Sequence, residues 1–168
     1  MPSLFDFATS EQICSEYKKS FLLNIFRKIC RKMKNDEKYN SEIKQLFRES
    51  CNINDTSKAI VRRYNYELEE DEAILMSNWL LANLYKTNNR KTPSDQLKKE
   101  LYKKQNGLCA VCNEELGNAW NNIHVDHIVP FSLVGDELEN NYQLLCTFCN
   151  ESKSAHTDYI FKSLIKLN

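Results

Sequence analysis

Two Cys-x-x-Cys pairs lie in the C-terminal half of this 168-residue chain. The first pair is Cys109 and Cys112, and the second is Cys146 and Cys149. Four cysteines at this spacing are typical of a closed tetrahedral zinc site with Zn–S distances of about 2.3 Å. Because all four positions are cysteine, no coordination position stays open for a substrate. We therefore predict a structural Zn²⁺ that joins the two ends of the segment between the pairs.

The segment of about residues 100–155 resembles the zinc-knuckle type of the HNH (His-Asn-His, ββα-metal) endonuclease family. The resemblance rests on four features of the sequence: the first cysteine pair, the run Val125-Asp126-His127-Ile128-Val129-Pro130, the run Asn141-Tyr-Gln-Leu-Leu-Cys146, and Cys149-Asn150 with Lys153. It implies a β-hairpin crossed by one helix, with a divalent ion between them. It does not extend to residues 1–92.

The resemblance also implies a role for each matching polar residue. His127 corresponds to the general base on the first strand, and Asn141 to the residue that holds the loop orienting this histidine. Asp126 and Asn150 correspond to the ligands of a catalytic metal. Lys153, one helical turn after Asn150, is the better candidate for a contact with nucleic-acid phosphates. His156, close to the same helix, is a weaker candidate for such a contact.

Phosphodiester hydrolysis agrees with these residue types on chemical grounds. An imidazole, whose ordinary pKa is about 6.5, accepts a proton from water at pH 7. A carboxylate and an amide are hard oxygen ligands, which suit Mg²⁺ or Mn²⁺ rather than a metal that prefers thiols. One such ion can neutralise both the phosphate and the leaving oxygen. The predicted cofactors are therefore Zn²⁺ for structure and Mg²⁺ or Mn²⁺ for catalysis.

The first 92 residues have the composition of a helical segment, because they contain no glycine and only one proline, Pro2. Apolar spacing and capping residues predict helices from Ser10, over Glu42 to Cys51, from Asp55 or Thr56, and from Glu69. A polar stretch, 87–93, marks the predicted boundary between a helical domain, 1–92, and the HNH domain, 93–168. The predicted fold class is α+β.

The HNH domain should begin with a helix capped by Ser94, followed by a strand at Ile123 and Val125. A loop at 134–137, a helix capped by Thr147 and a last helix over 158–167 complete the prediction. The remaining cysteines, which lie singly in helical patterns, are expected to be buried free thiols: Cys14, Cys30 and Cys51.

Charge is spread unevenly along a chain whose formal net charge is zero. Residues 1–92 carry 16 basic and 13 acidic side chains, whereas residues 93–168 carry 7 and 10. A nucleic-acid enzyme with an acidic catalytic half needs basic surface elsewhere. Its candidates are three groups in the helical domain: Arg27-Lys28 with Arg31-Lys32 and Lys34, Arg62-Arg63, and Arg90-Lys91. The alternative is that these groups are solvated helix faces.

No apolar run is long enough to span a bilayer, and the N-terminus lacks the pattern of a signal peptide, so we expect a cytoplasmic protein. The resulting hypothesis is a metal-dependent DNA endonuclease that nicks or cuts both strands, in restriction or anti-phage defence. Its helical domain contacts DNA, forms a homodimer or binds a partner protein. Two alternatives stay open: an effector nuclease that a partner activates, and a non-catalytic zinc-knuckle module that binds nucleic acid or protein.

Overall fold

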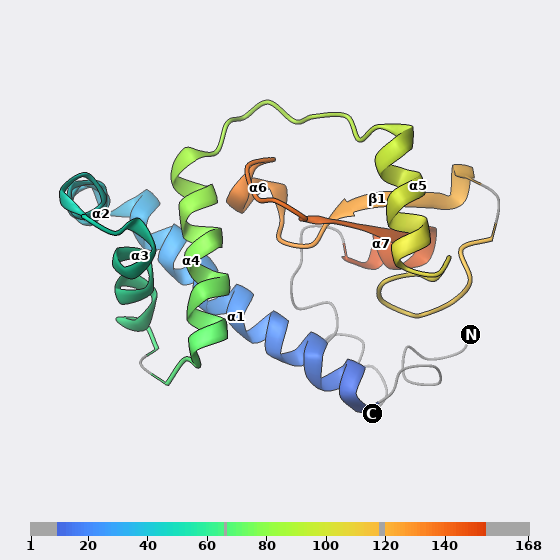
Figure 1. Cartoon of the computed structure of the whole chain (residues 1–168), viewed down its shortest axis with the longest axis horizontal. Helices are drawn as coiled ribbons and strands as arrows, with labels where there is room; N and C mark the ends of the chain where they lie inside the picture. The colour runs from blue at the N-terminus through green and yellow to red at the C-terminus, as the bar shows by residue number, and fades with distance from the viewer. Residues whose placement is uncertain (1–9, 66, 118–119, 154–168) are drawn as a thin grey trace. The chain divides into compact units, whose positions relative to one another are not determined.

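The computed structural model describes residues 10–65, 67–117 and 120–153 (Figure 1). Its contacts divide the chain into two compact units, which we describe separately. The helical unit comprises residues 21–90 and 129–139, and the hairpin unit comprises residues 1–20, 91–128 and 140–168. Helices with a small two-stranded sheet near the cysteines confirm the α+β class. The boundary near residue 92 stays a prediction.

Four helices precede the HNH segment: α1 Ser10–Asn35, α2 Glu37–Glu49, α3 Ile53–Arg62 and α4 Glu70–Tyr85. Helix α2 begins before the predicted Glu42 because the Asp36 carboxylate accepts the Tyr39 N–H at 2.9 Å. The predicted cap of α3 at Asp55 or Thr56 is wrong. The Asn52 side chain caps it instead, since its Oδ1 accepts the N–H groups of residues 54 and 55.

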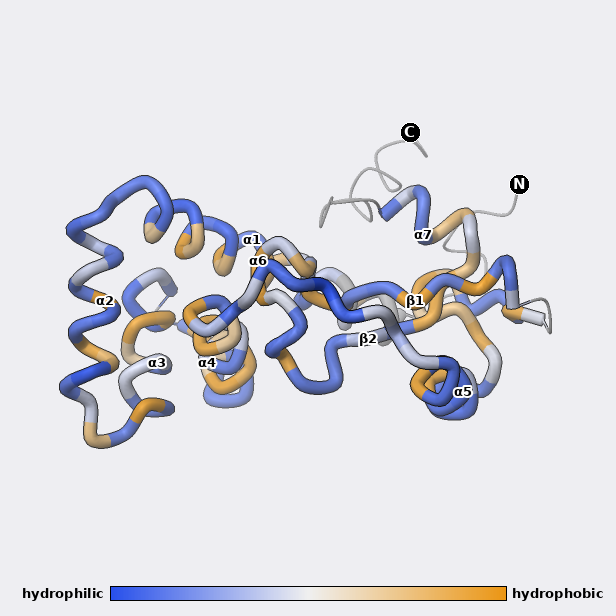
Figure 2. The backbone as a smooth tube through the Cα atoms, turned by 90° about the horizontal axis from the view of Figure 1, so that it is seen from above, coloured by the Kyte–Doolittle hydropathy of each residue, from blue (hydrophilic) through white to orange (hydrophobic). Residues whose placement is uncertain are grey.

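The apolar sides of these helices form the core of the helical unit, and hydrophobic and hydrophilic stretches alternate along the tube of the backbone (Figure 2). Phe26 and Trp79 meet edge to face at the centre, with ring centroids 5.6 Å apart and an interplanar angle of 62°. Several aliphatic side chains around them are completely or almost completely buried: Ile29, Ile43, Ile60, Val61, Met76 and Leu80. The aromatic side chains at the centre therefore pack the core and are not available to stack on bases.

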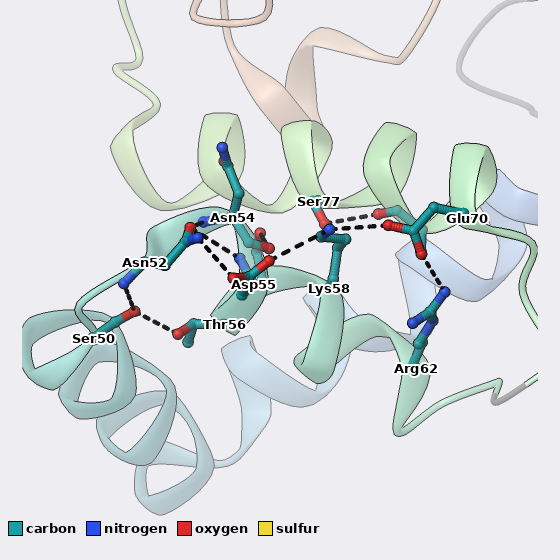
Figure 3. A network of polar contacts seen from close by, with 11 residues as sticks. Ser50, Asn52, Asn54, Asp55, Thr56, Lys58, Arg62, Glu70 and Ser77 are labelled. Carbon is teal, nitrogen blue, oxygen red and sulfur yellow. Dashed lines mark hydrogen bonds and ion pairs between the residues drawn. The ribbon is translucent and has the colours of Figure 1, made fainter.

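Polar side chains on the outside of α3 and α4 form a connected network (Figure 3). Glu70 accepts from Lys58 Nζ at 2.9 Å and from Arg62 Nη2 at 2.6 Å. Hydrogen bonds from these two cations lower the pKa of the Glu70 carboxyl, and the bond to Glu70 raises the pKa of Lys58. Exposed ion pairs contribute little to stability. The network does, however, engage Arg62, which belongs to one of the predicted basic groups.

The segment 129–139, which follows His127 closely in the chain, packs into the core of the helical unit. It contains a short helix, α6 Phe131–Val134, and the predicted loop follows it. Val129 and Val134 are buried with the core residues. Two side chains of the helical unit hold carbonyl groups of α6: Asn83 Nδ2 donates to Leu133 O at 2.5 Å, and Lys86 Nζ donates to Ser132 O at 2.8 Å.

Gly135 ends α6 in a conformation that only glycine adopts readily, with φ 63° and ψ −150°. A Cβ atom there would also lie 3.0 Å from Lys86 Cβ and 3.3 Å from Thr87 O. We expect Gly135→Ala to lower the free energy of unfolding by about 1–3 kcal/mol in urea denaturation. Gly117→Ala is the matched control, because φ is +62° but no atom lies within 4 Å of the added Cβ. Equal losses for both variants would contradict the steric part of this account.

The hairpin unit contains α5 Asp95–Lys104, a single 3₁₀ turn (η1) Trp120–Asn122, β1 Ile123–His127, β2 Tyr142–Cys146 and α7 Thr147–Lys153. Ser94 caps α5 as predicted, since its Oγ accepts the Leu97 N–H at 3.1 Å. Thr147 is the first residue of α7 and not its cap. β1 and β2 pair antiparallel, and α7 packs against both strands. The predicted last helix lies outside the described residues.

Two predictions about the single cysteines are wrong. Cys14 and Cys51 are exposed, and Cys30 is only partly buried. Cys51 follows the end of α2, and helical spacing alone did not reveal that the chain turns there toward solvent. Burial raises the pKa of the Cys30 thiol to about 12. Among the described helices, none combines the length and apolar character that crossing a membrane requires.

Candidate active site and zinc site

The β-hairpin places Asp126 and His127 next to each other at the end of β1. Their partners across the ladder are Gln143 and Tyr142, the first residues of β2. Successive side chains of a strand point to opposite faces. The exposed fraction of His127 is only 4%, whereas Asp126 is half-buried. The two chemical groups therefore occupy different environments although they are neighbours in the chain.

The His127 imidazole lies against the ring of Tyr142, with ring centroids 4.7 Å apart and an interplanar angle of 47°. Asn141 is also buried, and its main-chain O accepts the N–H of Ile128 at 2.9 Å. This bond extends the pairing by one step beyond the last residue pair of the strands. It fixes the backbone on the C-terminal side of His127, where the chain leaves the sheet.

Lys153, at the end of α7, connects the helix with β1. Its ammonium group forms an ion pair with Asp126 Oδ2 and donates to His127 O at 2.5 Å. Gln143 Nε2 lies 3.4 Å from the same carboxylate oxygen. Only 8% of Lys153 is exposed, so this cation is part of the site and not of the outer surface. The Asp126 carboxylate thus lies where the structure already stabilises a positive charge.

The four cysteines predicted to bind zinc come together in the hairpin unit. Their sulfur atoms all lie within 4.8 Å of one another, and the sulfurs of Cys112 and Cys146 are 3.8 Å apart. Tetrahedral coordination with Zn–S of about 2.3 Å requires sulfur atoms about 3.8 Å apart. The sulfurs are thus close to the arrangement that zinc needs, and their chemistry is that of a structural Zn²⁺ site.

Hydrogen bonds within this cluster favour a thiolate at Cys109 and a thiol at Cys149. The N–H of Cys146 points to the Cys109 sulfur, and the N–H of Cys149 points to the Cys146 sulfur, both at 3.4 Å. A hydrogen bond from the Cys149 thiol, helped by backbone N–H groups, lowers the pKa of Cys109 to about 4. Burial raises the pKa of Cys112 to about 12, and the bond to Cys109 raises that of Cys149. Zinc binding must displace the protons that remain.

Gln105 supports both sites and was not identified from the sequence. Its Nε2 donates to Leu108 O at 2.9 Å and to Leu144 O at 3.0 Å, and its Oε1 accepts the Leu144 N–H at 2.7 Å. It therefore joins the end of α5, the first cysteine loop and the middle of β2. A glutamine just after a helix is common, and no sequence signal separates this one from a surface residue.

The structure brings together Asp126, His127, Asn141 and Lys153 at one end of the hairpin. Asn150 is half-buried on α7, three residues before Lys153 and thus on a neighbouring position of the same helix side. The side chains of Tyr142 and Gln143 contact His127 and Asp126. Both residues belong to the motif that begins at Asn141, but the sequence indicated no role for them. His156 lies outside the described residues. The contact of Lys153 with nucleic acid stays a prediction, and its described contacts are within the protein.

Comparison with known proteins gives one match, which falls on this region. The model of the HNH endonuclease family matches residues 108–156. This range contains both cysteine pairs, β1, α6, β2 and α7, so it confirms the resemblance recognised from the motifs. The matched segment is thus similar to an HNH endonuclease domain, and the match does not reach α1 to α5. Neither the curated proteins nor the solved structures gave a match to the chain.

Proposed function

We propose that this chain is a metal-dependent endonuclease that hydrolyses phosphodiester bonds of DNA. The observation that carries the proposal is the placement of Asp126 and His127 at the end of β1, with α7 across the hairpin and Lys153 reaching the carboxylate. This arrangement lies inside the segment that matches the HNH family. A zinc-knuckle binding module alone needs only the four cysteines and does not explain the buried imidazole beside a carboxylate.

In the proposed reaction, His127 accepts a proton from the attacking water. Its burial against Tyr142 restricts the ring to a narrow range of orientations, and the main chain of Asn141 fixes the adjoining backbone. General-base catalysis of this kind contributes about 10²–10⁴-fold to a rate. We therefore assign Asn141 a positioning role, in which it affects the reaction only through the His127 imidazole.

Asp126 and Asn150 are the residues that we propose as ligands of Mg²⁺ or Mn²⁺. Their oxygen donors suit these hard cations, and the Asp126 carboxylate already lies against a cation, the Lys153 ammonium. The ion would supply charge neutralisation at the phosphate and at the leaving oxygen. Lys153 already pairs with Oδ2 of this carboxylate. A divalent ion that binds Asp126 therefore either displaces the Lys153 ammonium group or shares the carboxylate with it.

Competition at Asp126 gives a prediction that does not depend on activity. We expect Lys153→Met to lower the Tm of the protein without Mg²⁺ or Mn²⁺. The substitution removes the ammonium group that pairs with the Asp126 carboxylate and donates to the His127 carbonyl. Mn²⁺ should then raise the Tm of the variant more than it raises that of the wild type, because no ammonium group competes. Thermal unfolding with and without Mn²⁺ measures both effects. Identical Mn²⁺ shifts would contradict competition, and Lys104→Met, on exposed α5, is the control.

The ends of the products test the reaction that we propose. Hydrolysis of the type implied by the family leaves a 5′ phosphate and a 3′ hydroxyl. We therefore expect DNA ligase to rejoin nicked products without prior treatment. Products with a 3′ phosphate, which ligase does not join, would contradict the proposed attack. A setting in restriction or anti-phage defence, and a choice of DNA over RNA, stay predictions from the resemblance.

A further inference from the structure

A basic cleft lies within the helical unit, and none of the residues that line it has been given a role in the nuclease site. Its volume is about 580 Å³. It is lined by parts of α1, α2, α4 and α6, which all belong to this unit. Five lining residues are cationic, and no aspartate or glutamate is among the described residues that line it: Arg27, Arg31, Lys34, Lys44 and Lys86.

Three of these cations lie on one side of α1. Arg27, Arg31 and Lys34 follow the spacing i, i+4, i+7, which places side chains on a single helix face. With a rise of about 1.5 Å per residue, they span about 10 Å along the helix axis. One strand of duplex DNA carries a phosphate every 3.4 Å or so of helix axis, and thus about three phosphates over this length. Lys44 and Lys86 add positive charge on the other walls.

The surroundings distinguish this cleft from the other basic groups of the sequence. Arg62 is paired with Glu70, and Lys32 lies over the ring of Tyr39 at 4.3 Å from its centroid. Arg90 lies 5.6 Å from the centroid of the Phe131 ring. In the cleft, by contrast, several cations from different helices line one concave surface, which strengthens the attraction for an anion.

We propose that this cleft binds phosphates of the DNA backbone and so supplies the basic surface that the acidic C-terminal half lacks. The inference rests on the proposed nuclease function and names a substrate contact for it. No aromatic side chain lines the cleft, so it offers no stacking surface for a base. Contacts of cationic side chains with backbone phosphates do not depend on the base sequence. Free nucleotides, which present a base as well, match this lining less well than the backbone of a duplex.

The cleft is also connected through the chain to the catalytic hairpin. Ser132 and Leu133, which line it, belong to the segment between His127 and Asn141. Lys86 lines the cleft and holds Ser132 O, and Asn83 lines it and holds Leu133 O. A phosphate bound by Lys86 is thus bound by a residue that also anchors the connection between the two catalytic strands.

DNA binding without cleavage tests the proposal. The variant Arg31→Ala/Lys34→Ala/Lys44→Ala removes three exposed cations of the cleft and spares Lys86 and Arg27. Its matched control is Lys28→Ala/Lys38→Ala/Arg63→Ala, which removes the same residue types from exposed positions that do not line the cleft. Affinity for a 30-base-pair duplex is measured by fluorescence anisotropy at several salt concentrations, with the zinc-loaded protein and no added Mg²⁺ or Mn²⁺. Unchanged circular dichroism shows that each variant is folded.

We expect the cleft variant to bind the duplex at least tenfold more weakly at about 0.1 M salt, and the salt slope to fall by about 2.7, which is 0.9 for each lost phosphate contact. The control should change by less than threefold. Equal losses in both variants, or no loss in either, would overturn the proposal. Competition by ATP as strong as that by duplex, at equal phosphate concentration, would also overturn it in favour of a nucleotide site. Because binding is measured without the proposed catalytic metal and does not depend on cleavage, failure of the nuclease proposal would leave this result interpretable.

Discussion

His127→Gln abolishes DNA cleavage while the protein stays folded and binds DNA as before. Glutamine keeps a polar side chain of similar size beside Tyr142, but it cannot accept a proton from water. We expect the single-turnover rate to fall by about 10²–10⁴-fold, the range that general-base catalysis contributes. The measurement is cleavage of a duplex under enzyme excess, with affinity determined separately without added Mg²⁺ or Mn²⁺.

His124→Gln is the control for this substitution. His124 lies on the same strand, and its Nε2 is 3.2 Å from Thr147 Oγ1 rather than against Tyr142. We expect its rate to stay within about threefold of the wild type, because it has no part in proton transfer. Equal losses in both variants would contradict the role of His127.

Cys149→Ser abolishes zinc binding and unfolds the hairpin unit. The Cys149 sulfur is completely buried and lies within 4.8 Å of the other three. Structural zinc sites contribute an apparent 10–16 kcal/mol or so to folding, which exceeds the stability of an ordinary domain. The apolar residues packed around the cysteines are few, so the hairpin unit has little else to stabilise it: Leu101, Val111, Leu116, Ile123, Leu144 and Leu145.

Metal analysis and amide hydrogen exchange check this prediction. We expect one zinc per wild-type chain and none in the variant, with loss of protection in β1 and β2. Cys51→Ser is the matched control, because Cys51 is an exposed free thiol outside the cluster, and zinc content and protection should not change. A Cys149→Ser protein that keeps protection in both strands would show that zinc is not needed for the fold of this unit.

The residues that carry the proposed chemistry were more predictable from the sequence than the residues that hold them in place. Asp126, His127 and the four cysteines are marked by residue type and spacing, since metal and acid–base chemistry restrict both. The pairing of Lys153 with Asp126 was not predicted, because it depends on how α7 crosses β1. The same holds for Gln105, whose bonds to Leu144 join segments about 40 residues apart. Such contacts come from tertiary packing, which local patterns do not encode.

Helix existence was predicted better than helix ends. Helical spacing of apolar residues, together with capping residues, identified all four helices of the N-terminal part. The end of a helix depends on a single capping hydrogen bond. Asp36 and Asn52 make these bonds, and the residues predicted to begin the two helices do not. The packing of α6 with the helical unit was also not predicted, because a short apolar segment does not indicate which core it joins. The exposed Cys51 shows the same limit.

The central claim is that the chain hydrolyses DNA with a divalent metal, and conversion of supercoiled plasmid to nicked or linear forms tests it most directly. The purified, zinc-loaded chain is incubated with Mg²⁺, with Mn²⁺ or with neither ion, beside His127→Gln. We predict conversion with Mg²⁺ or Mn²⁺, none without them, and none above background with the variant. No conversion by the folded wild type in either metal would contradict the claim for the isolated chain, and conversion that persists without either ion or in the variant would contradict the mechanism.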